Sequence, residues 1–364
     1  MCVCNLLTNQ IGEYMNKHAV LFAALLGVSG SALAATNVTL YGRLDIGYEV
    51  KDVKGQKDTV TQEGKDGGNT RLGVKGQEDL GNGYAATFQL EGRFDGDTGS
   101  KTVNRTFFDR ESTVGLKTPY GHIRMGRSYS AMDQAIGFID VGRRYSSVGT
   151  YDFVKGVKSR HSNAFFYNHK IEGFSFGGDI TTKGGYNDGL KTVGGVDNVA
   201  FSDEGAPGSK VAYGLFAKYQ GNGLEAGVGY QDDGVRKSGS IRKQWGVGVA
   251  YTIDPVTFGL SYSAGKDDVV GSQGKIKNYG GYISGKLTPN DTLMAFYRRA
   301  NYTNTVGTVK KTDDKTTRYG IGYVHALSKR TSIYADVARQ ETKAMNGVKT
   351  EKFTGWDIAL RHNF

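Results

Sequence analysis

Apolar and polar side chains alternate along most of this chain, and the last eleven residues, 354–364, show the pattern most clearly. One set of alternate positions is apolar except for a single histidine: Trp356, Ile358, Leu360, His362 and Phe364. The positions between them are polar or small: Asp357, Ala359, Arg361 and Asn363. Because successive side chains of an extended strand point to opposite faces, the segment is predicted to be a strand with one apolar and one polar face.

The same alternation recurs in about a dozen other segments, and the chain reads as sixteen strands. In the first, residues 38–50, Leu40 and Leu44 alternate with Arg43 and Asp45. Later segments pair into hairpins through short turns, which are typical of antiparallel neighbours. The pattern therefore predicts an all-β chain.

The connections between the predicted strands differ in length. Short turns lie near 79–83, 118–121, 221–223, 254–255, 288–291 and 328–330. Long polar connections lie near 51–69, 94–105, 183–208, 232–242, 267–276, 303–316 and 342–353. Transmembrane β-barrels have this asymmetry, with short turns on the periplasmic side and long loops outside. No apolar run after residue 34 approaches the ~18 residues that a membrane-spanning helix needs, so we predict a sixteen-stranded antiparallel transmembrane β-barrel.

Glycines lie within the predicted strands on the polar side: Gly73, Gly115, Gly227, Gly246, Gly259 and Gly322. In a water-filled barrel, small inward residues would leave the lumen open, whereas a soluble barrel fills its centre with branched side chains. The glycines therefore favour a channel. The alternative is a two-sheet sandwich in which the apolar faces form a shared core.

The N-terminal segment is typical of a secretory leader. Lys17 and His18 give a basic start, residues 19–30 are apolar, and 32–34 read Ala-Leu-Ala. We expect a signal peptide with cleavage near Ala34/Ala35 and a single barrel domain over 35–364. The apolar run is too short for the alternative, a membrane anchor. Residues 1–14 precede a plausible initiator methionine, and both cysteines lie among them, so no disulfide or thiolate metal site is expected in the mature chain.

One long connection, residues 128–159, differs from the others because it is apolar, with Ile136, Phe138 and Ile139 among its residues. Exposed loops are normally polar, so this third loop is expected to pack against the inner wall of the barrel and narrow the channel. It also carries Asp133 and Asp140. A long external loop is the alternative.

The chain resembles the trimeric Gram-negative general porins, particularly the neisserial and β-proteobacterial branch, over essentially all of residues 35–364. The motifs that carry the resemblance are Val38-Thr-Leu-Tyr-Gly42, Arg71-Leu-Gly-Val-Lys-Gly76, Glu78-Asp-Leu-Gly-Asn-Gly83, Val114-Gly-Leu116, Met125-Gly-Arg127 and the terminal Phe364. The resemblance implies an outer-membrane location in a Gram-negative bacterium, a homotrimer, contact with outer-membrane lipid, and a third loop folded inward as an eyelet.

In that family, basic residues of the wall face acidic residues of the third loop across the constriction. The matching positions here are Arg43, Arg71, Arg110, Arg127 and Arg160 on the wall and Asp133 and Asp140 on the loop. Arg43 and Arg71 also lie on the polar face of their strands by alternation. Arg110 and Arg127 share the alternation of apolar neighbours, so each needs a bulge or a strand end to face inward. The alternative for each arginine is a solvated charge at the rim.

The net charge of +10 does not change when residues 1–34, which hold one lysine and one glutamate, are removed. A basic lumen favours small anions. Nucleic-acid binding is not expected, since the charges form no basic stripe. No catalytic motif or metal-ligand spacing of histidines occurs in the sequence, so neither an enzyme nor a cofactor is expected. We expect a passive pore for ions and small hydrophilic solutes; a substrate-specific channel, and less so a barrel enzyme or adhesin, are the alternatives.

Overall fold

The computed structural model describes residues 37–53, 59–63, 70–100, 107–139, 159–182, 190–193, 196–200, 211–234, 241–269 and 272–364. All of them belong to one compact unit, Thr36–Phe364. The leader expected over 1–34 and loop residue Asp140 lie outside the described residues. The described part of the chain holds no helix long and apolar enough to cross a membrane.

The described residues form nineteen strands and two short helices. The strands are β1 (Asn37–Val53), β2 (Thr59–Glu63), β3 (Arg71–Gly81), β4 (Tyr84–Arg93), β5 (Glu111–Thr118), β6 (Gly121–Tyr129), β7 (Arg160–Ile171), β8 (Phe174–Thr181), β9 (Leu190–Val193), β10 (Val196–Ala200), β11 (Tyr213–Gly221), β12 (Leu224–Asp232), β13 (Lys243–Ile253), β14 (Val256–Val269), β15 (Ser272–Lys286), β16 (Asp291–Val306), β17 (Val309–Ala326), β18 (Thr331–Lys343) and β19 (Lys349–Asn363). The helices are α2 (Ala131–Ile136) and the 3₁₀ turn η1 (Gly137–Ile139).

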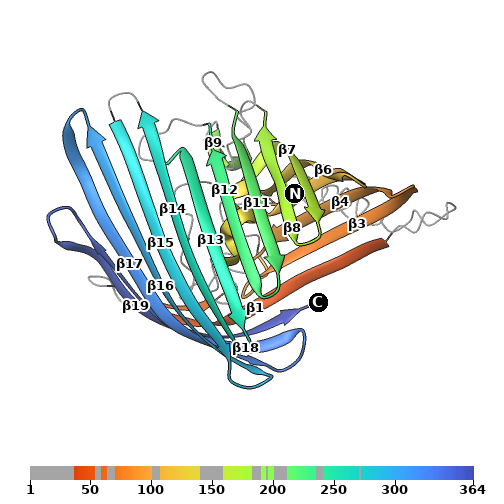
Figure 1. Cartoon of the computed structure of the whole chain (residues 1–364). Coiled ribbons are helices and arrows are strands. Elements are labelled where there is room, and N and C mark those ends of the chain that lie inside the picture. The colour runs from red at the N-terminus through yellow and green to blue at the C-terminus, as the bar shows by residue number, and fades with distance from the viewer. Residues whose placement is uncertain are drawn as a thin grey trace, which may run out of the picture. The chain divides into compact units, whose positions relative to one another are not determined.

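Sixteen of the strands close into an antiparallel barrel, which confirms the predicted fold class. The first strand, β1, pairs with β3 on one side and with the last strand, β19, on the other (Figure 1). The circuit continues through β8, which pairs with β11. Three strands stand apart from this circuit: β2 pairs with the far end of β1, and β9 and β10 pair with each other.

Asparagine–glycine pairs close two of the tight hairpins. Asn82 and Gly83 join β3 to β4 with φ of 53° and 80°, and Asn222 and Gly223 join β11 to β12 with 51° and 77°. Positive φ at both central residues is the mark of the type I′ turn, whose twist matches that of the strands it connects. The sequence therefore specifies the register of these hairpins locally.

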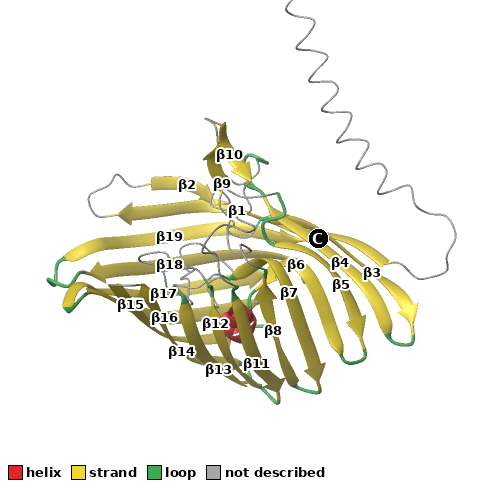
Figure 2. Ribbon diagram, turned by 90° about the horizontal axis from the view of Figure 1, so that it is seen from above, coloured by secondary structure: helices red, strands yellow, loops and turns green. Residues whose placement is uncertain are grey.

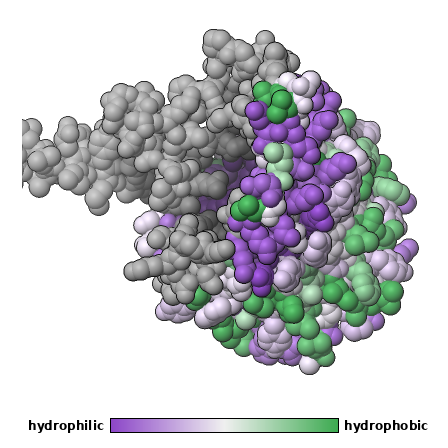
Figure 3. All heavy atoms as spheres, turned by 90° about the vertical axis from the view of Figure 1, so that its left-hand side faces the viewer, coloured by the Kyte–Doolittle hydropathy of each residue, from purple (hydrophilic) through white to green (hydrophobic). Residues whose placement is uncertain are grey.

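The predicted alternation separates the two faces of the wall. On β1, Leu40 is 64% exposed while Asp45 is 3% exposed, and on β19 Trp356 is 49% exposed while Asp357 is 1% exposed. Apolar side chains therefore point out of the barrel and polar ones point in, the reverse of a soluble protein. In Figure 3, hydrophobic residues gather over the lower and right-hand parts of the face shown, with hydrophilic residues above them.

Three of the predicted long loops are wrong, because strands extend through them. β14 continues to Val269 and β15 begins at Ser272, and β16 and β17 leave only residues 307–308 between them. The predicted loop at 342–353 likewise shortens to the residues between β18 and β19. Above the apolar band both faces of a strand are polar, so the alternation disappears although the backbone pairing does not.

Two of the six inward glycines, Gly227 and Gly246, do not simply leave space as predicted, because the third loop occupies it. α2 and η1 pack against the glycine-bearing face of β12 and β13, where a Cβ at Gly246 would lie 2.5 Å from Met132 Cε and one at Gly248 would lie 2.8 Å from Ile139 Cγ1 (Figure 2). A Cβ at Gly227 would overlap the backbone carbonyl of Ala135. These glycines of β12 and β13 leave the space into which α2 and η1 pack. Residues 140–158 lie outside the described residues, so the inward fold of the whole third loop stays a prediction.

Candidate pore constriction

A file of arginines crosses three neighbouring strands of the inner wall. Arg43 on β1 lies directly opposite Arg71 on β3, and Arg71 lies directly opposite Arg93 on β4. Like charges in directly opposed positions destabilise a sheet, so acceptors are needed close by. Arg43 Nε donates to Asn363 Oδ1 at 2.7 Å, and Arg93 Nε lies 3.3 Å from Asp109 Oδ2.

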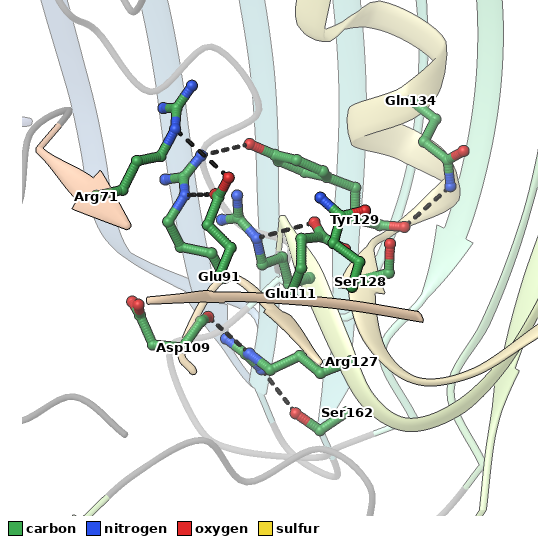
Figure 4. A network of polar contacts seen from close by, with 12 residues as sticks. Arg71, Glu91, Asp109, Glu111, Arg127, Ser128, Tyr129, Gln134 and Ser162 are labelled. Carbon is green, nitrogen blue, oxygen red and sulfur yellow. Dashed lines mark hydrogen bonds and ion pairs between the residues drawn. The ribbon is translucent and has the colours of Figure 1, made fainter. Parts of the chain in front are cut away.

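Glu91 on β4 is the carboxylate at the centre of this file. It forms an ion pair with Arg110, and its Oε2 lies 3.5 Å from Arg71 Nε (Figure 4). Arg110 Nη2 also donates to the hydroxyl of Tyr129 at 3.0 Å. One carboxylate therefore serves two guanidinium groups and leaves an excess of positive charge. Nothing in the alternation pattern had distinguished Glu91 from other polar positions.

Tyr129 separates two of the predicted arginines. The guanidinium of Arg160 lies 3.8 Å from the centroid of the Tyr129 ring, within the range of a cation–π contact. Arg160 Nε also lies 3.9 Å from Glu111 Oε1. Both Arg110 and Arg160 are buried, at 8% and 5% exposure. The structure thus brings Arg110 and Arg160 together around one tyrosine, and Arg71 joins them through its ion pair with Glu91.

Arg127 lies apart from that group. Its Nε donates to the backbone carbonyl of Asp109 at 2.7 Å and its Nη1 to Ser162 Oγ at 2.6 Å. Figure 4 shows these three residues on the other side of an edge-on strand from Glu91. Simple strand alternation does not decide on which side Arg110 and Arg127 lie. Arg110 precedes the first residue of β5, so strand alternation does not apply to it. Arg127 lies where the β6–β7 register shifts, between Gly126 and Ser128.

The loop acids are placed only in part. Asp133 lies in the first turn of α2, where its backbone N–H donates to Ser130 Oγ at 3.5 Å in an N-cap. Asp140 directly follows η1 and lies outside the described residues.

Two wall side chains hold the ends of the α2–η1 segment. Asp179 on β8 accepts from the backbone N–H of Ala131 at 2.6 Å, and it is itself paired with His161. Arg298 on β16 donates through Nη2 to the carbonyl of Ile139 at 2.9 Å. A carboxylate at a helix start and a cation at its end match the polarity of the peptide dipoles. These anchors join residues 48 and 159 positions apart, so sequence reasoning missed them.

A second ion pair lies on the same face near the meeting of β1 and β19. Arg361 Nη2 lies 2.5 Å from Asp45 Oδ2, and the hydroxyl of Tyr334 donates to Asp45 Oδ1 at 2.7 Å. The alternation had placed Asp45 and Arg361 on the polar face without pairing them. Within the described ranges, no group of three or more His, Cys, Asp or Glu side chains is placed to hold a metal ion.

A family model described as Gram-negative porin matches residues 19–345. The chain belongs to the Gram-negative porin family. Its curated relatives include outer membrane porin protein 32 of Delftia acidovorans, 29% identical over 96% of this chain and all of the relative. Another is an outer membrane porin protein of Bordetella pertussis, which is 25% identical over 96% of this chain and all of the relative. The predicted family and outer-membrane location are confirmed, and the relatives are named as channels rather than enzymes.

Solved structures show the same fold. A loop-deletion form of OmpT, an outer membrane protein of Vibrio cholerae, superposes with a TM-score of 0.66 at 15% identity, covering 91% of this chain and all of that one. A porin from Comamonas acidovorans, described as anion-selective, superposes with a TM-score of 0.65 at 23% identity, covering 90% of this chain and all of that one. At these identities the likeness concerns the fold alone.

Proposed function

We propose that this porin is a general diffusion channel, a passive water-filled pore for ions and small hydrophilic solutes with a weak anion preference. The observation that carries the proposal is the excess of arginine on the wall between β1 and β7. The arginines in contact there are Arg43, Arg71, Arg93, Arg110, Arg124 and Arg160, and the carboxylates are Glu91, Asp109 and Glu111. Asp45 and Glu49, buried acids on the same face of β1, bring the carboxylates to five, so among these described side chains six cations against five anions leave one positive charge in excess. A basic lumen raises the local concentration of small anions.

In this proposal, the third loop narrows the channel. The seating of α2 and η1 on inner-face glycines supports a loop that continues through residues 140–158 into the lumen. Asp140 would then stand opposite the arginine wall, as the resemblance implies. Two unit charges ~4 Å apart interact by ~1 kcal/mol in bulk water and ~4 kcal/mol at an intermediate dielectric. Interaction energies of that size favour the passage of one kind of ion without trapping it, as conduction requires.

A homotrimer in outer-membrane lipid is also part of the proposal. A further structural neighbour is titled a trimer form of the Vibrio cholerae protein, at 16% identity and a TM-score of 0.63. Mature porins with exposed apolar faces need lipid or another subunit against those faces. The proposal includes neither an enzymatic activity nor binding of nucleic acid.

One observation favours the alternative, a substrate-specific channel. A cavity of about 370 Å³ lies beside Phe138 of η1 and Tyr282 of β15, with Thr252, Thr257 and Ser284 in its lining. Ring faces with hydroxyl groups around them could retain a polyhydroxylated solute.

Solute uptake separates the two functions. Liposomes that contain the purified protein should take up small neutral solutes at rates that rise linearly with concentration, because a passive pore has no site to saturate. Saturation at millimolar solute, lost in Tyr282→Ala but kept in the matched Tyr297→Ala on the outer face, would instead establish a specific channel.

A further inference from the structure

His161, the second residue of β7, is enclosed between two carboxylates near the start of α2. Its side chain is 1% exposed, and the side chains of Asp179 on β8 and Asp233, just beyond β12, are also buried. Asp179 pairs with His161 Nδ1, and Asp233 Oδ1 lies 3.2 Å from His161 Nε2. Figure 2 shows α2 close to β8, β11 and β12. The ring therefore joins three segments of the chain beside the third loop.

The two carboxylates determine which form of the imidazole fits. An ionised carboxylate only accepts hydrogen bonds, and a neutral imidazole donates through one nitrogen alone. Nδ1 can donate to Asp179 while Nε2 donates to Asp233 only when the ring is an imidazolium. Hydrogen bonds between ionised partners are shorter and stronger than neutral ones. The geometry thus requires a buried cation between two buried anions.

Gln231 on β12 fixes the second carboxylate. Its Nε2 donates to Asp233 Oδ1 at 2.6 Å and lies 3.4 Å from His161 Nε2. The backbone N–H of Asp233 donates to the carbonyl of Arg242 at 2.9 Å. A neutral ring that donates through Nδ1 would turn the lone pair of Nε2 toward the Asp233 oxygen. Because Asp233 is held from both sides, it could not move away from that repulsion.

The other charged groups around the ring have different partners. They are Tyr129, Asp133, Arg160, Asp232 and Arg242. The Arg160 guanidinium lies 3.8 Å from the centroid of the Tyr129 ring. Asp232 accepts two hydrogen bonds from Arg242, and Asp133 belongs to the first turn of α2. Among the described side chains, Asp179 and Asp233 are therefore the titratable groups bonded to the imidazole.

Asp179 connects the ring to the third loop. Its Oδ1 accepts from the backbone N–H of Ala131 at 2.6 Å, while its Oδ2 bonds to His161 Nδ1. Ala131 is the first residue of α2 and is fully buried. A carboxylate with both oxygens bonded has one orientation. The bond to the imidazolium therefore fixes the oxygen that holds the start of the helix.

We propose that His161 is a positioning residue of the third loop, an imidazolium that fixes the start of α2 to β8 and to the end of β12. This arrangement, called here the His161 clamp, is intact while the ring is protonated. It is lost as the pH rises and the ring becomes neutral, because one of the two donors disappears. Asp179 can then turn, and the start of α2 can move. The effect on conduction rests on the proposed narrowing by the third loop, whereas the clamp itself does not.

Nitrogen NMR of the mature protein with labelled histidine rings, in detergent micelles, tests the charge of the ring. The signals of His161 are assigned by their absence from H161Q. Both ring nitrogens should carry a proton at neutral pH, and one should lose it only in alkaline solution. The matched control is H169Q on the same strand, where the ring of His169 lies 5.5 Å from that of Phe176. An unprotonated nitrogen of His161 at neutral pH would overturn the proposal.

Hydrogen exchange over residues 128–136 tests the hold on α2. In H161Q these amides should exchange at least about tenfold faster than in the wild type, the change expected when one hydrogen bond to a charged group is lost. H169Q should exchange as the wild type does. The open-channel current noise of the wild type should rise from neutral to alkaline pH, and that of H161Q should be high at both.

Equal exchange in H161Q and the wild type would overturn the proposal, because α2 would then be held without the ring. Heat-modifiable mobility verifies that the variant folds. If it does not fold, D233N removes the charge beside Nε2, and its His161 ring should lose its proton at a lower pH than the wild-type ring. Faster exchange in H161Q with unchanged current noise would refute the proposed narrowing and leave the clamp standing.

Discussion

The contact between the third loop and the inner wall can be tested by replacing one inner-wall glycine with a larger residue. In Gly229→Val, the new Cβ would lie 2.7 Å from Ala135 Cβ and 3.4 Å from Met132 Cα. Both atoms are fixed to the backbone of α2, so the helix as a whole must move. Ordinary contact begins near 3.4 Å, which requires a shift of about 0.7 Å for the Cβ alone. The two methyl groups of valine extend that shift further into the lumen.

Overpacking of this kind costs ~1–3 kcal/mol, and the displaced helix should lower the single-channel conductance. The matched control is Gly285→Val on the outer face, where the nearest atom to the new Cβ, Val256 Cγ2, lies 3.7 Å away. Conductance in a planar bilayer and the thermal midpoint in detergent are the measurements. If Gly229→Val conducts and unfolds like Gly285→Val, the contact between α2 and β12 does not position the loop.

The other predictions concern the wall and its anchors. Leu360→Arg places a charge among the outward side chains of β19 and should cost ~2–4 kcal/mol near mid-bilayer, measured by urea unfolding in liposomes and contradicted by wild-type stability. Arg298→Met removes the donor to the carbonyl of Ile139 and should raise open-channel current noise, whereas Arg299→Met, its outward neighbour, should not. Cysteine at Arg43 should react with a water-soluble thiol reagent from the lumen much faster than cysteine at Val228, and equal rates would refute the assignment of faces.

The alternation of side chains was sufficient to predict the barrel and its two faces. Leu40, Leu360 and Asp357 lie where period-two spacing puts them, because one face of each strand meets lipid and the other does not. Beyond the apolar band that contrast vanishes, so the outer ends of β14 to β19 could not be recognised from hydropathy. The Asn-Gly turns were readable for a different reason, since their backbone preference is local.

The candidate site could be predicted only one residue at a time. Arg43 and Arg71 follow from strand alternation, and their direct opposition follows from the register between β1 and β3. The ion pair of Glu91 with Arg110 and the contact of Arg298 with Ile139 depend on which strands become neighbours when the barrel closes. No local pattern contains that information. Gly227 and Gly246 were misread for the same reason, because their function depends on a helix about a hundred residues away.

The reversal potential in a salt gradient tests the central claim, a channel whose anion preference originates at the arginine wall. In a planar bilayer, neutralising Arg43 and Arg71 together with glutamine should move the zero-current potential toward cation selectivity, and Asp140→Asn should move it the other way. The matched control Lys310→Gln/Lys311→Gln, in the exposed β16–β17 hairpin, should change it little. All shifts should shrink in molar salt, where the screening length falls to ~3 Å. A potential unmoved by the arginine pair but shifted by the hairpin lysines would contradict the account.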